Sequence, residues 1–372
     1  MSPPLLAPGQ GERWRAKRDG VGVIFSLLLA VASSLPASAA ERTGAEVAEE
    51  FARPALEAFA QSTQALAAAT AALCETPGAP ALEATRKAFG EAVDGWGRIS
   101  VLRFGPLAAE SRFERLFFWP DVRGIGLKQV QKVLASKDES AATAEGLAEK
   151  SVAAQGLPAL EFTLFGSGSE SLAAGDDPFR CAYAAATAQN IANVAGEVRG
   201  GWVDGTDFAS SFTAPAAEKD PYRSAAEVDG EIVKAADTAF QYIRAAELLP
   251  PLGDAPEDAN GRRAPLWRSG LSFRLVDAQI AGVRALLGAA GYRETLPAET
   301  GWVIDSIDFE LDNVQRMLGD MEHPPQDAFA DKDDRGRIAF ANLALDHAGY
   351  MVAENLAAAL GLVMGFNALD GD

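Results

Sequence analysis

The sequence predicts an all-α protein built from two halves, each of them like a four-helix bundle. Ala-rich segments with amphipathic spacing recur along the chain, whereas alternating Val, Ile and Thr runs bounded by hairpin turns are absent. A stretch rich in Pro, Ser, Thr and Ala, residues 208–221, divides these segments into two sets and is expected to be a linker. Up to four helices on each side is the number that a packed bundle requires.

The first 39 residues are predicted to be an export signal. Four basic residues precede an apolar stretch at 21–32, which is too short to span a bilayer, and Ala37-Ser38-Ala39 provides a small-x-small cleavage pattern. No cysteine lies at the cleavage site, so a lipid anchor is not expected. We therefore expect a periplasmic protein with no membrane span after signal cleavage, an uncleaved anchor being the alternative.

The remaining chain is expected to form a first helical bundle over 40–207 and a second over 222–372. Pro54 is expected to kink the first helix near its start, because proline cannot donate the helical hydrogen bond. The apolar residues of the second half include a narrow stripe from Ile304 to Leu318 at spacings of three and four, which suits bundle packing. The expected helices are 46–73, 81–99, 126–135, 144–154, 178–203, 225–247, 269–290, 297–318 and 338–364.

Charge and composition exclude several classes of function. The chain has 52 acidic and 33 basic residues, a net charge of −19 that falls to −21 after signal cleavage, so nucleic acid is not an expected partner. Cys74 and Cys181 could form one disulfide in an oxidising compartment or remain two buried thiols. With only two histidines, any metal site must depend mainly on carboxylates.

One segment could carry chemistry. Gly156 breaks a helix, Pro158 suits the first turn of the next one, and Glu161 lies beside a buried leucine stripe near its N-terminus. A carboxylate in that position is either solvated or held by an arginine or a cation. His347 on the last long helix could be a second ligand, or a hydrogen-bonded core residue.

At these residues the sequence resembles the imelysin family, named after a proposed insulin-cleaving metalloprotease of bacterial cell envelopes. The family signature is Gly-x-His-x-x-Glu; Gly156 and Glu161 match it, and Pro158 occupies the histidine position. Further segments resemble the predicted periplasmic branch of the family. These are residues 102–107, 118–121 with Arg123-Gly124, and 365–372.

The resemblance implies two helical bundles with a site in a groove, and a substrate-binding or accessory role in bacterial iron acquisition. We expect Glu161 and Asp121 as anionic contacts, with Arg103 and Arg123 as counter-charges or anion contacts. Iron or another divalent cation is the expected ligand if a metal binds, with Glu161 and His347 as candidate ligands.

The protein is expected not to be an enzyme, because proline can neither coordinate a metal nor donate a hydrogen bond. Its expected partners are iron-uptake or envelope proteins. The alternatives are a cell-envelope metallopeptidase and a ligand-free scaffold of an envelope complex.

Overall fold

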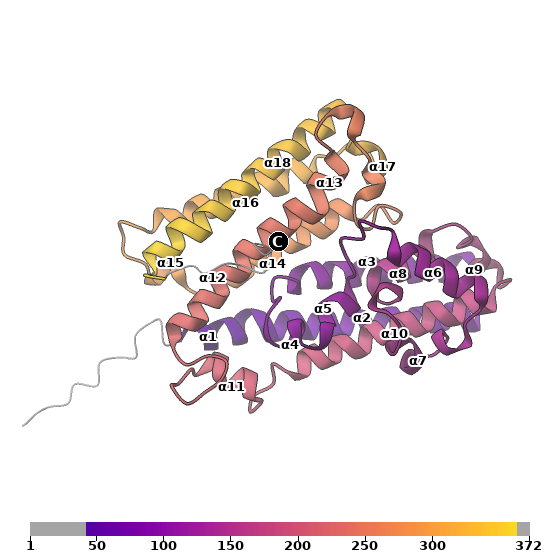
Figure 1. Ribbon diagram of the computed structural model, residues 1–372, viewed down its shortest axis with the longest axis horizontal. Helices are drawn as coiled ribbons and strands as arrows, with labels where there is room; N and C mark the ends of the chain where they lie inside the picture. The colour runs from indigo at the N-terminus through magenta and orange to yellow at the C-terminus, as the bar shows by residue number, and fades with distance from the viewer. Residues whose placement is uncertain (1–41, 363–372) are drawn as a thin grey trace, which may run out of the picture. The chain divides into compact units, whose positions relative to one another are not determined.

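The computed structural model describes residues 42–362, and these are helical with no strand among them (Figure 1). The all-α prediction is confirmed. The predicted export signal, residues 1–39, and the family-like segment 365–372 lie outside the described residues. Seven helices of 18 residues or more form the frame. They are α2 (Arg53–Glu75), α3 (Ala79–Ile99), α10 (Pro178–Gly200), α12 (Ala225–Tyr242), α14 (Ser272–Ala289), α16 (Trp302–Gly319) and α18 (Lys332–Tyr350).

Shorter elements connect these helices. Two medium helices are α6 (Ile125–Ser136) and α8 (Gly156–Phe165). The single-turn or two-turn helices are α1 (Thr43–Glu46), α4 (Gly105–Ala108), α5 (Arg112–Leu116), α7 (Ala144–Ala148), α9 (Glu170–Ala174), α11 (Asp207–Thr213), α13 (Leu249–Leu252), α15 (Tyr292–Thr295), α17 (Pro325–Ala328) and α19 (Ala357–Ala359). Three π-helical segments continue or precede long helices at Val47–Ala52, Ile243–Leu248 and Met351–Leu356.

Side chains near the helix starts explain several of the observed boundaries. Asp177 accepts a hydrogen bond from the Arg180 N–H and caps α10, whose first residue is proline. Asp331 caps α18 in the same way, so this helix begins at Lys332, six residues before the expected start. The π-helical turn Val47–Ala52 precedes Arg53 and Pro54, which begin α2, and the missing N–H of Pro54 leaves a carbonyl in this turn without its usual helical donor.

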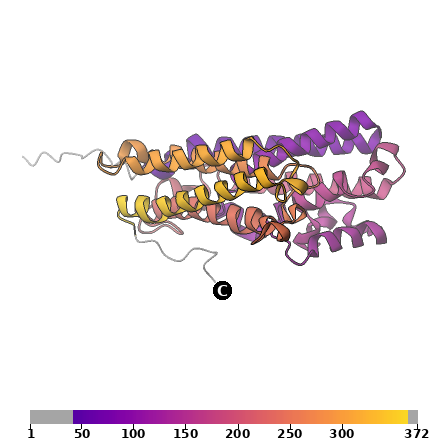
Figure 2. The same ribbon diagram turned by 90° about the horizontal axis from the view of Figure 1, so that it is seen from above.

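Two sets of helices pack against each other through α3 and α14. Helices α2, α3 and α10 pack together, and α12, α14, α16 and α18 form the second set, in which α16 and α18 run side by side (Figure 2). A Cβ on Gly282 would lie 2.2 Å from the Arg98 carbonyl oxygen, so only glycine lets α14 approach α3 this closely. One core cluster extends through both sets.

The segment 208–221 contributes to this core. It begins inside α11, and Phe208 and Phe212 pack with Trp202 and Tyr222 in an aromatic group. Phe212 is fully buried. The division of the chain into two bundles at this segment stays a prediction.

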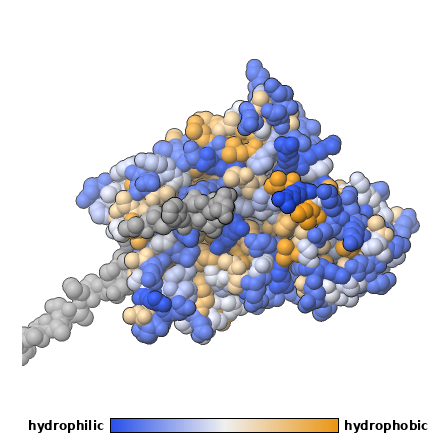
Figure 3. Space-filling view, in the orientation of Figure 1, coloured by the Kyte–Doolittle hydropathy of each residue, from blue (hydrophilic) through white to orange (hydrophobic). Residues whose placement is uncertain are grey.

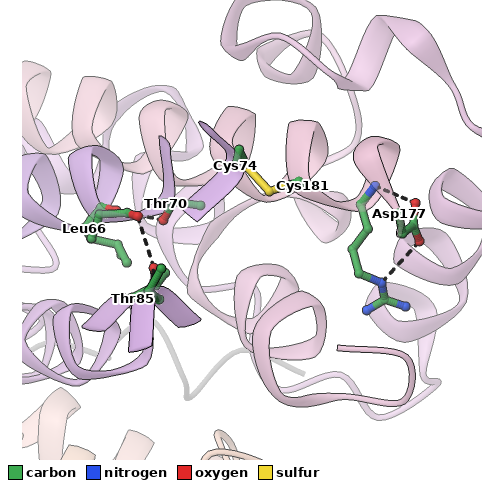
Figure 4. Close-up of a disulfide and its surroundings, with 9 residues drawn as sticks. Leu66, Thr70, Cys74, Thr85, Asp177 and Cys181 are labelled. Atoms are coloured by element: carbon green, nitrogen blue, oxygen red, sulfur yellow. Dashed lines mark hydrogen bonds and ion pairs between the residues drawn. A yellow bond between two sulfur atoms is a disulfide. The ribbon is translucent and has the colours of Figure 1, made fainter. Parts of the chain in front are cut away.

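A disulfide between Cys74 and Cys181 joins the end of α2 to the start of α10 (Figure 4). The two cysteines are 107 residues apart in the sequence, so the bond closes a long loop within the first set of helices. Of the two alternatives that the sequence left open, the structure forms the disulfide. No helix in the range 42–362 has the length and apolar character needed to cross a membrane.

Candidate ligand-binding site

The candidate site is centred on α8, whose start depends on Gly156. This residue has φ +75°, and a Cβ there would lie 2.4 Å from the Leu116 carbonyl oxygen. Both facts require glycine. Pro158 then occupies the first turn, where a missing N–H costs nothing, and Leu157, Leu160 and Leu164 are buried. This packing fixes the helix face on which Glu161 lies.

Glu161 is buried, with 3% of its surface exposed, and its partners come from a loop 108 residues away. The Ser269 N–H and hydroxyl both donate to its Oε1, at 2.9 and 3.0 Å. A guanidinium nitrogen of Arg268 lies 3.8 Å from its Oε2. Burial raises the pKa of Glu161, and the contacts from Ser269 and Arg268 oppose this shift. Of the partners expected from the sequence, arginine is therefore the one observed.

A cavity of about 150 Å³ opens beside Glu161. Its walls come from α6, α8, the segment before α6 and the loop around residues 262–268. The lining residues that can bind a ligand through charge or an aromatic ring include Trp119, Asp121, Glu161, Arg262, Trp267 and Arg268. Apolar side chains such as Phe162 and Leu266 fill most of the remaining wall. Apolar walls with a few polar groups are typical of small-molecule sites.

Asp121 lines the same cavity as Glu161, so the structure brings these two predicted acids together. Its carboxylate accepts the backbone N–H groups of Ile125 at 2.6 Å and Gly126 at 2.9 Å. These N–H groups belong to the first turn of α6, which has no partner of its own for them. Asp121 therefore pairs with the N–H groups at the start of α6, and both of its oxygens already accept hydrogen bonds.

Two of the predicted arginines lie elsewhere. Arg103 pairs with Glu114 at 3.4 Å and stacks over the Phe113 and Tyr242 rings, at 4.0 and 5.2 Å from their centroids. Arg123 is exposed and is not part of the cavity wall. The counter-charge expected from these two residues is supplied by Arg268.

Arg262 and Arg268 both stack on Trp267, and none of the three was expected at the site from the sequence. Their guanidinium carbons lie 5.5 and 4.5 Å from the Trp267 ring centroid. Desolvation lowers the pKa of Arg268; Glu161 opposes this shift and the like charge of Arg262 adds to it. One sequence feature could have indicated these site residues. Arg262-Arg263 is followed by Trp267-Arg268 in a Pro- and Gly-rich loop, and binding residues often lie in loops.

His347 lies on a different surface. Its Nδ1 is 2.8 Å from Glu310 Oε1, in a groove between α16 and α18 that is lined by Phe309, Phe340 and Leu343. Hydrophobic residues, orange in Figure 3, also gather in patches between hydrophilic areas on the face drawn there. His347 therefore does not share the Glu161 cavity, and the structure does not bring the two candidate metal ligands together.

The residues around Glu161 do not form a metal-ligand set. Within residues 42–362, the one group of three or more His, Cys, Asp or Glu side chains close enough to share an ion is His323, Asp331 and Asp334. Asp334 is fully buried there and accepts the backbone N–H groups of Glu322 and His323. Because Arg337 also binds Asp334, this group is explained by the local packing at the start of α18.

Comparison with known proteins finds one matching family and similar structures, and these matches cover most of the chain. The imelysin family model matches residues 52–351. An imelysin-like protein from Psychrobacter arcticum 273-4 has a similar structure, with a TM-score of 0.70 and 21% identity over 89% of this chain and 98% of that one. A protein named as an iron-regulated protein A precursor, from Parabacteroides distasonis ATCC 8503, has a TM-score of 0.71 and 12% identity over 86% and 95%. The comparison with curated proteins gives no match.

Proposed function

The chain belongs to the imelysin family, and from this we propose that it is an exported, non-enzymatic binding protein of bacterial iron uptake. The cavity beside Glu161 is the proposed ligand site. One observation carries the proposal. The family motif on α8 and the charged and aromatic residues of a distant loop lie at the same cavity. Iron is favoured as the cargo because one structural neighbour is named as an iron-regulated protein.

The proposed absence of peptidase activity rests on the motif. A metal-activated water needs several strong ligands with an open position. Pro158 stands where the family signature has its histidine, and Glu161 is already bound by Ser269 and Arg268. We therefore expect no chelator-sensitive cleavage of a peptide library by the mature protein, and such cleavage would favour the metallopeptidase alternative.

The periplasm is the proposed location, and an envelope or iron-uptake protein is the proposed partner. The predicted export signal supports this location, and a disulfide between Cys74 and Cys181 is consistent with an oxidising compartment. A precursor named among the structural neighbours is also consistent with export.

Isothermal titration calorimetry of the mature protein tests the proposal. Ferrous and ferric ions, zinc and ferric citrate are titrated separately into wild type, Glu161→Gln, which keeps the side-chain volume, and Glu161→Ala. We expect at least one iron species to bind wild type and its affinity to change in both variants, because Glu161 lines the cavity and contacts Arg268. Glu145→Ala, an exposed acid on α7, is the control and should bind as wild type does. Absence of heat with every iron species would favour the scaffold alternative.

A further inference from the structure

The charges on the cavity wall indicate which kind of ligand it takes. Arg262 and Arg268 both lie on this wall and stack on the same indole ring. Stacking holds each guanidinium plane in place and leaves its N–H edge able to donate. Two cationic groups are thus fixed at one cavity of a protein whose overall charge is −19.

Both acids of the cavity already have partners within the protein. Glu161 Oε1 accepts two hydrogen bonds from Ser269, and both oxygens of Asp121 accept backbone N–H groups of α6. Neither carboxylate therefore has both oxygens free of partners, and Glu161 Oε2 faces the positive charge of Arg268 at 3.8 Å.

The arginines are not satisfied to the same degree. Among residues 42–362, the Arg262 guanidinium has no ion-pair or hydrogen-bond partner. Its one cation–π contact within that range is with the Trp267 ring. Arg268 reaches Glu161 at 3.8 Å, which is beyond hydrogen-bond distance. Donors of this kind, held over an aromatic ring and close to a second cation, favour a negatively charged ligand.

Taking the proposed function as its basis, we infer that this cavity binds a small anion bearing carboxylate or phosphate groups, so that iron enters it as an anionic complex and not as the free ion. A free divalent cation would approach two guanidiniums, whereas an anion can accept hydrogen bonds from both. The volume of about 150 Å³ has room for a group of roughly the size of benzene, so a complex as large as ferric citrate would enter it with one carboxylate-bearing part. The Trp267 ring provides an apolar wall for its carbon atoms.

Arg262 provides the sharpest test because its neighbour is a matched control. Both Arg262 and Arg263 are exposed and belong to one 3₁₀ turn, Gly261–Arg263, but only Arg262 lines the cavity. Citrate, ferric citrate, inorganic phosphate, ferrous ion and zinc are titrated into wild-type mature protein, Arg262→Gln and Arg263→Gln. We expect an anion to bind wild type, Arg262→Gln to weaken it about 10- to 100-fold, and Arg263→Gln to bind as wild type does.

The possible outcomes separate this inference from the proposed function. Binding of citrate or of phosphate with loss in Arg262→Gln supports the anion site, and binding of phosphate alone would count against iron as the cargo. Binding of free ferrous or zinc ions without any anion would overturn the inference and leave the proposed function standing. An anion that binds Arg262→Gln as tightly as wild type would also overturn the inference, and no binding by any probe would overturn both.

Discussion

Glu247 is a buried acid whose ionisation should lower the stability of the fold. Glu247 is 1% exposed and lies in the π-helical segment Ile243–Leu248, where Gln279 Nε2 donates to its Oε1 at 3.0 Å. Within the described residues, Glu247 Oε2 and Gln279 Oε1 have no hydrogen-bond partner. Burial raises the pKa of Glu247 to about 8, although the bond from Gln279 opposes the shift. A proton on this carboxyl group would supply the donor that the two oxygens lack.

The raised pKa sets the sign of the pH dependence. The carboxyl group titrates at 4.5 in the unfolded chain and at about 8 in the folded one. Between these values unfolding releases a proton, so the contribution of Glu247 to the free energy of unfolding is fully present below pH 4.5 and is lost progressively as the pH rises to 8. At 1.36 kcal/mol per unit, the loss over the whole interval is about 5 kcal/mol.

The substitution Glu247→Gln removes this titration and keeps an amide that can pair with Gln279. We expect the variant to approach wild-type stability at pH 5 and to exceed it increasingly toward pH 8, by urea unfolding followed by circular dichroism. Other buried acids with raised pKa values, Glu161 and Asp229, remain in both proteins, so the difference between the two curves isolates Glu247. Glu145→Gln, which changes an exposed acid, is the control. Parallel pH profiles of wild type and Glu247→Gln would show that ionisation of Glu247 does not control the pH dependence of stability.

Three further predictions follow from the disulfide, the motif glycine and the distant histidine. Replacing Cys74 and Cys181 by serine should cost about 5 kcal/mol of unfolding free energy, because their bond closes a loop of 107 residues; equal urea midpoints would contradict this. Gly156→Ala should lower the melting temperature, since a Cβ there meets the Leu116 carbonyl oxygen, and calorimetric scanning would detect this. His347→Ala should leave ligand affinity in titration calorimetry unchanged, whereas a loss would connect its groove with the Glu161 cavity.

The helices could be predicted from the sequence because their causes are local. Amphipathic spacing located the long helices, and the expected segment 178–203 differs from α10 mainly at its end. The predicted start of α18 is six residues later than the observed one. The residues after Asp331 are acidic, and the sequence pattern did not identify Asp331 as the helix cap. The expected helix 144–154 is divided into α7 and the 3₁₀ turn Val152–Ala154, whose cap is Ser151.

The site could be predicted only in part, because its second wall comes from far along the chain. Gly156, Pro158 and Glu161 are close in sequence, and their local pattern located α8 correctly. Arg268 meets Glu161 across 107 positions, and no periodicity encodes a contact between a helix and a loop so distant. Arg103 was expected near the acid because it lies in the family-like segment 102–107 and carries a positive charge, but it pairs with Glu114, which is much closer in the sequence.

The position of bound iron distinguishes an anion site at the Glu161 cavity from any other iron site in the protein. Crystals of the mature protein soaked in ferric citrate can be measured at the iron absorption edge, where an anomalous difference map locates the metal. One strong peak is expected at the cavity between Glu161 and Trp267, with the anion in contact with Arg262. A peak only at His347 or at the Asp331 and Asp334 group, with no density in the cavity, would contradict it.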